Sequence, residues 1–106
     1  MKTSIIVTTE KIGFHQYKDA PEKVKFLRNL HRHKFYIKVG LPVTHDNREL
    51  EFFTVQRELN DFLKNKKVVG SCEMLAREIK KWADKTYQRK CWCEVWEDNE
   101  NGSRVE

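Results

Sequence analysis

Two histidines separated by one residue, His31 and His33, are the side chains in this sequence whose type and spacing could do chemistry. They open a run in which apolar residues recur at every second position, which predicts a β-strand from about Leu30 to Thr44. A period of two places both imidazoles on one face, roughly 6–7 Å apart along the backbone. That span suits two ligands of one metal ion, but two half-buried histidines bonded to the backbone would have the same pattern.

A third histidine, His15, follows a β-branched stretch that predicts a strand over Ser4–Thr9, continuing to Tyr17 after a bend at Gly13. If this strand pairs antiparallel with the next one, three imidazoles come together. Three histidines suit zinc and leave a coordination position open for water or a ligand. The alternative for His15 is a surface loop, and His45 is expected in a turn facing solvent.

Two helices are predicted after these strands. An apolar stripe predicts the first over Thr54–Lys64. The second begins after Gly70, with Ser71 as its N-cap and Glu73 in the first turn, where the helix dipole favours an anion. The polar segment Lys18–Asn29, which contains a proline, is predicted to be a loop.

Lys90–Glu97 alternates again and predicts a third strand, and Ser103–Glu106 predicts a short fourth strand. The order β-β-α-α-β-β indicates an α+β fold, with a four-stranded antiparallel sheet and two helices on one face. At 106 residues the chain is one domain, 1–106. Its two exposed sheet edges and lean core predict that an oligomer completes the fold.

The formal charge of +5 permits an anionic partner, but acidic and basic residues interleave, as on a solvated surface. A basic row with one aromatic residue (Arg32, Lys34, Tyr36 and Lys38) lies opposite the histidines on the central strand and could contact nucleic-acid phosphates. We interpret it instead as a solvated face or the lining of an oligomeric barrel. No membrane span or signal pattern is found, and the three cysteines predict reduced thiols in a cytoplasmic protein.

Several of these segments together resemble the 6-pyruvoyl-tetrahydropterin synthase and 6-carboxytetrahydropterin synthase family. The family has a histidine followed by a His-x-His, as in His15 and Leu30-His31-Arg32-His33-Lys34-Phe35. Ser71-Cys72-Glu73-Met74-Leu75-Ala76 resembles the start of its second helix, and Val95-Trp96-Glu97 resembles its C-terminal Val-x-Glu. The resemblance spans about residues 5–98, and the element order matches the family's tunnelling fold.

The resemblance implies roles for the matching residues. His15, His31 and His33 would hold Zn²⁺, which would polarise substrate oxygens. Glu97 would accept hydrogen bonds from the amino group and ring N–H of a pterin, and Glu73 would lie near the site. It also implies a trimer or hexamer with sites at subunit interfaces.

The sequence departs from the family where protons are moved. Leu27 occupies the position of the catalytic cysteine, four residues before the first histidine of His-x-His. The family's Asp-His pair between the helices is also missing, because residues 60–70 contain no histidine. General base catalysis needs a titratable group within reach of the proton. Glu22, Lys23 and the three cysteines are the replacements to consider, so the catalytic residues stay unknown.

Two functions follow from this comparison. One is a zinc-dependent enzyme, a carbon–oxygen lyase or a hydrolase, acting on dihydroneopterin triphosphate or a related pterin with an altered proton relay. The other is a non-catalytic module that binds a pterin, a purine-like ligand or only a metal. Nucleic-acid binding is the weaker third possibility.

Overall fold

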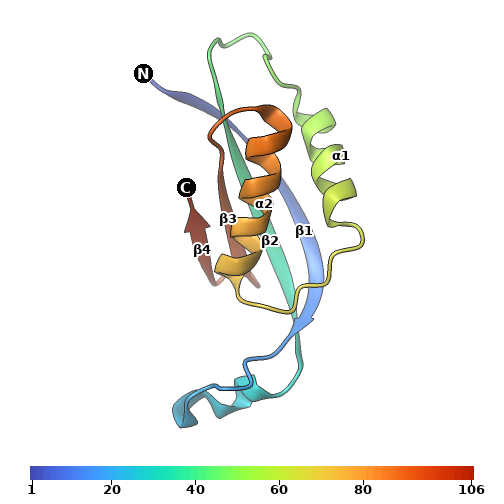
Figure 1. Cartoon of the computed structure of the whole chain (residues 1–106), viewed down its shortest axis with the longest axis vertical. Helices are drawn as coiled ribbons and strands as arrows, with labels where there is room; N and C mark the ends of the chain where they lie inside the picture. The colour runs from blue at the N-terminus through green and yellow to red at the C-terminus, as the bar shows by residue number, and fades with distance from the viewer.

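The computed structural model describes residues 1–106 and contains one four-stranded sheet with helices packed on one of its faces (Figure 1). The elements follow the chain in the order β1 (Thr3–His15), the 3₁₀ helix η1 (Glu22–Arg28), β2 (His31–Val43), α1 (Phe52–Leu63), α2 (Cys72–Tyr87), β3 (Trp92–Glu97) and β4 (Asn101–Val105). The spatial strand order is the chain order, and every neighbouring pair is antiparallel. The predicted α+β arrangement is therefore confirmed.

The core lies between the sheet and the two α-helices, and alternation along the strands explains it. Phe35, Ile37 and Val39 of β2 are fully buried, while the residues between them face the open side of the sheet. From the helices, Leu59 and Ile79 pack into the same cluster. Neither α-helix has the length and apolar composition needed to cross a bilayer.

The β1–β2 hairpin is the longest feature of the molecule (Figure 1). Its thirteen paired positions end with His15 opposite His31. The predicted bend at Gly13 is wrong, because β1 runs through it unbroken. A Cβ atom there would lie 2.9 Å from both Phe35 Cε2 and Val68 Cβ. Glycine is therefore needed for close packing rather than for a turn.

The segment Lys18–Asn29 projects from the end of this hairpin, and the prediction that it is only a loop is wrong. It contains η1, which follows Pro21 and is kinked at Val24. Glu22 forms ion pairs with Lys25 and Arg28 across it, each at 3.5 Å. None of the residues in η1 is buried, so no apolar periodicity marks this helix in the sequence.

The remaining boundaries differ from the prediction by a few residues. α1 begins at Phe52, two residues early, because the Glu51 carboxylate accepts hydrogen bonds from the backbone N–H groups of Phe53 and Thr54. α2 begins after Ser71, whose hydroxyl oxygen caps Met74 N as predicted. β4 begins at Asn101, two residues before the predicted start at Ser103, because Glu97 pairs with Asn101 across a three-residue turn.

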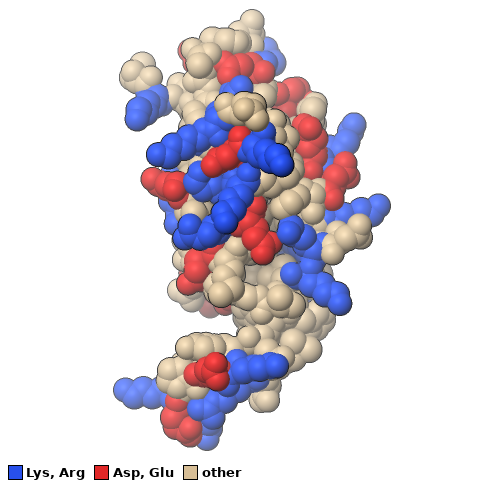
Figure 2. Space-filling view, in the orientation of Figure 1, with Lys and Arg blue, Asp and Glu red and all other residues tan.

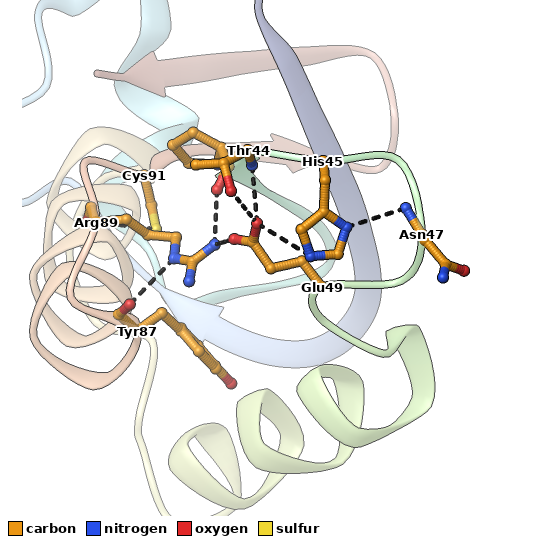
Figure 3. Close-up of polar contacts among 8 residues, drawn as sticks. Thr44, His45, Asn47, Glu49, Tyr87, Arg89 and Cys91 are labelled. Atoms are coloured by element: carbon orange, nitrogen blue, oxygen red, sulfur yellow. Dashed lines mark hydrogen bonds and ion pairs between the residues drawn. The ribbon is translucent and has the colours of Figure 1, made fainter.

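A polar network joins the connection between β2 and α1 to the connection between α2 and β3 (Figure 3). The Glu49 carboxylate accepts hydrogen bonds from Thr44 N at 2.9 Å and from the Thr44 hydroxyl, and pairs with the Arg89 guanidinium. Arg89 Nη1 also donates to the carbonyl of Pro42 at 2.9 Å. This network fixes the connection after β2 to the connection that precedes β3.

Candidate metal centre

The outer end of the β1–β2 hairpin brings the three predicted histidines together. His15 comes from β1 and is 9% exposed, while His31 and His33 come from the start of β2. Their ring centroids lie 4.6–4.9 Å apart, with the rings edge to face. One ligand atom from each histidine lies within 4.8 Å of the others, so a small inward movement of the rings would let one metal ion bind all three.

Hydrogen bonds at Nδ1 set the orientation of all three rings. His15 Nδ1 lies 3.1 Å from the carbonyl oxygen of Gly70, and His31 Nδ1 lies 2.7 Å from that of Asn29. His33 Nδ1 contacts the Asp98 carboxylate. Carbonyl and carboxylate oxygens only accept hydrogen bonds, so each Nδ1 must carry the hydrogen, and a neutral ring then has a lone pair at Nε2.

The Nε2 atoms of His15 and His33 both lie near one carboxylate, that of Glu97. The buried Nε2 atoms of His31 and His33 have no hydrogen-bond partner. Glu97 Oε1 lies 3.4 Å from His15 Nε2, and Glu97 Oε2 lies 3.8 Å from His33 Nε2. Lone pairs and a carboxylate that converge repel one another unless a proton or a metal cation lies among them. The donor set therefore fits a metal ion bound through Nε2.

A cavity of about 590 Å³ opens beside the triad. His15 and His31 line it, together with Glu97 from β3 and Glu73 from the first turn of α2. His33 does not line the cavity, and its Nε2 is buried. Both predicted glutamates thus line the same cavity as His15 and His31. The predicted solvent-facing His45 is exposed and lies outside the cluster.

The two glutamates differ in their surroundings. Glu73 is exposed, and hydrogen bonding to its own backbone N–H and then to the Ser71 hydroxyl lowers the pKa of its carboxyl. Glu97 is paired with Phe35 in the β2–β3 register, which places its side chain on the core face, two positions along β2 from His33. A ligand in the cavity would therefore meet the carboxyl group of Glu73 at the helix start and that of Glu97 near the histidines.

The candidates for a replacement base are not all near the cavity. Glu22 and Lys23 lie on η1 and do not line it, whereas Leu27 does, so an alkyl group occupies that part of the wall. Of the three free cysteines, only Cys72 lines the cavity. Burial, and after it the Glu97 carboxylate, raises the pKa of the Cys72 thiol to about 12. Cys72 is therefore a neutral thiol at neutral pH.

Sequence reasoning missed Asp98, whose carboxylate contacts His33. Its signal in the sequence is the Asp98-Asn99 pair, because these residue types favour turns. In the structure the pairing of Glu97 with Asn101 leaves a three-residue connection, Asp98, Asn99 and Glu100. The basic row of β2 lies on the open face of the sheet, away from the cavity, and Lys34 of that row pairs with Glu10 at 3.0 Å.

Charged side chains of both signs interleave over the face in Figure 2, as the sequence predicts. A mostly uncharged zone separates the helices from the projecting segment in this view. Compared with models of known protein families and with curated protein sequences, the chain matches none.

Proposed function

We propose that this chain is a zinc-dependent, pterin-synthase-like protein with a tunnelling fold, which acts on dihydroneopterin triphosphate or a related pterin. The observation that carries the proposal is the convergence of three histidines, two of them with a buried Nε2 that has no partner, beside a cavity lined by carboxylates. The choice of zinc as the metal and of a pterin as the ligand comes from the motif resemblance. The geometry of the site is compatible with both but does not identify either.

The residues of the cavity divide the binding of such a substrate between them. The triad would hold the zinc ion, which supplies Lewis-acid polarisation of the substrate's side-chain oxygens when bound. The Glu97 carboxylate would accept paired hydrogen bonds from the amino group and ring N–H of the pterin. Glu73, ionised and exposed at the start of α2, would orient the ligand from the helix side of the cavity.

A second candidate function is a pterin- or metal-binding module without turnover. The observation that favours it is the cavity wall itself, where Leu27 and a thiol with a pKa of about 12 occupy the places from which a base would act. A neutral thiol can donate a proton but is a poor base at neutral pH. Turnover would then require Glu73 or Glu97 to accept the proton.

The first test is the metal content of the purified protein and of three variants. We expect zinc in the wild type and its loss in His31→Ala and His33→Ala, because removing one of three ligands leaves an incomplete site. His45→Ala is the matched control, since it removes an imidazole outside the cluster. Elemental analysis measures the outcome, and unchanged metal in the triad variants would contradict the site.

The second test separates the two functions. Zinc-loaded protein is incubated with dihydroneopterin triphosphate, and the products are identified by mass spectrometry. Release of triphosphate with a new pterin supports an enzyme, whereas binding of the pterin without product supports the binding module. If the protein neither binds the pterin nor forms a product, that result would contradict the pterin proposal and leave only the metal centre.

A further inference from the structure

The Asp98 carboxylate connects the turn between β3 and β4 to the metal centre. One oxygen contacts His33 Nδ1, and the other accepts a hydrogen bond from Lys34 N at 2.9 Å. The backbone N–H of Asp98 donates in return to the Lys34 carbonyl at 2.8 Å. Three hydrogen bonds therefore hold this residue against the part of β2 that carries His33.

The backbone of the turn shows that the carboxylate is not there for the turn alone. Asp98 and Asn99 both have left-handed conformations, with φ of 49° and 60°. Glycine adopts this conformation with less strain than aspartate does. Turn geometry therefore does not require a carboxylate at position 98. The hydrogen bonds from His33 Nδ1 and Lys34 N do require an acceptor side chain there.

His33 differs from the other two histidines in its Nδ1 partner. His15 and His31 bond neutral backbone carbonyls, which no substitution can remove, while His33 bonds a charged side chain. A carboxylate at this position holds the ring orientation and makes Nε2 a stronger donor to a metal. It also offsets one of the two positive charges that a divalent ion would bring among three neutral rings.

We propose that Asp98 is a positioning residue of the metal centre, which orients His33 and strengthens divalent-metal binding without touching the metal. This inference rests on the metal centre of the proposed function, and not on the pterin. It assigns the β3–β4 turn, on the opposite side of β2 from β1, a part in a site whose ligands all come from the β1–β2 hairpin.

The test compares Asp98→Gly with Asn99→Gly in the full chain. Both place glycine at a left-handed position of the same turn, but only the first removes a histidine partner. We expect Asp98→Gly to weaken zinc binding roughly 10- to 100-fold, measured by chelator competition, and to change the visible spectrum of the Co²⁺-loaded protein. Asn99→Gly should leave both unchanged.

A third variant separates charge from orientation. In Asp98→Asn the amide oxygen still accepts a hydrogen bond from His33 Nδ1–H, so we expect zinc affinity between those of the wild type and Asp98→Gly. Equal zinc affinities and equal Co²⁺ spectra for Asp98→Gly and Asn99→Gly would overturn the inference, whatever happens to the melting temperature of the metal-free protein. A wild type that binds no zinc would instead overturn the metal centre itself.

Discussion

Glu97 is the side chain on which the metal centre and the cavity meet. Its carboxylate lies 3.4 Å from His15 Nε2 and also lines the space in which a ligand would bind. At that distance from the Nε2 atom it could serve either the ligand or the ion. The two possibilities predict different consequences when only the charge is removed.

Glu97→Gln keeps the size of the side chain and removes its charge. We expect pterin binding to weaken roughly tenfold, because charge-assisted hydrogen bonds are worth about 1.5–3 kcal/mol, while the zinc content stays unchanged. Titration calorimetry with a pterin and elemental analysis measure the two quantities. Glu100→Gln, an exposed carboxylate in the neighbouring turn, is the control.

The opposite pattern would change the assignment of Glu97. If Glu97→Gln lost zinc together with pterin binding, the carboxylate would belong to the coordination of the metal. If neither quantity changed, Glu97 would be a surface carboxylate with no part in the site.

At the scale of elements, Glu49 and Arg89 join the ends of two loops that flank the core. Hydrogen bonds from the Thr44 side chain and backbone, and then from Arg89, lower the pKa of Glu49 from its usual 4.5 to about 2. A carboxyl whose pKa is depressed in the folded state stabilises that state fully above pH 4.5. The stabilisation is lost progressively as the pH falls from 4.5 to 2.

Glu49→Gln should therefore lower the melting temperature at pH 7. The difference in melting temperature between wild type and variant should become smaller as the pH approaches 2. Thermal unfolding of both proteins between pH 7 and pH 2 measures the difference. Parallel curves, with the same gap between wild type and variant at every pH, would contradict the role of the ionised carboxylate.

The elements that the sequence predicted well share a strong local signal. Apolar alternation around Phe35 predicted the sheet, and the apolar stripes that contain Leu59 in α1 and Ile79 in α2 predicted the helices. Burial of one face imposes a period of two on a strand and of about 3.6 on a helix. η1 was missed because none of its residues is buried. The triad could be predicted because His15 ends the first strand and the His-x-His pair begins the second. Antiparallel pairing of these two strands brings the three histidines together.

The part of the site that the sequence did not give comes from contacts between distant segments. Asp98 contacts His33 from 65 positions away, and Gly70 supplies a carbonyl to His15 from 55 positions away. The cavity depends on where α2 begins relative to β3, which a pattern of apolar residues cannot fix. Cys72 was therefore not distinguished from the other two cysteines.

At the scale of the molecule, the chain is elongated for its length. Its radius of gyration is 15.1 Å, against about 13 Å for a compact domain of this size. β1 and β4 are open edges of the sheet, and β1 carries Ile6, Ile12 and Phe14, each about half exposed. Unpaired edges and exposed apolar side chains are features that assembly would cover.

We expect the protein to form a trimer or hexamer, with the open face of the sheet turned toward the inside of an oligomeric barrel. Light scattering after size exclusion should give three or six times the mass of one chain. Replacing Ile12 with a charged residue should reduce that mass. The same replacement at the exposed Val69, in the connection between α1 and α2, should not. The mass of a single chain for the wild type would contradict the assembly.

The position of the triad at the last pair of the β1–β2 hairpin has a consequence for the chain's own mechanics. An ion held by His15 and His31 would act as a clip across the neck of the projecting segment, closing residues 16–30 into a tied loop as a disulfide would. None of the residues in η1 is buried, so metal would restrain a helix that the core does not anchor. Metal supply would then govern how firmly this loop is held, independently of any reaction in the cavity.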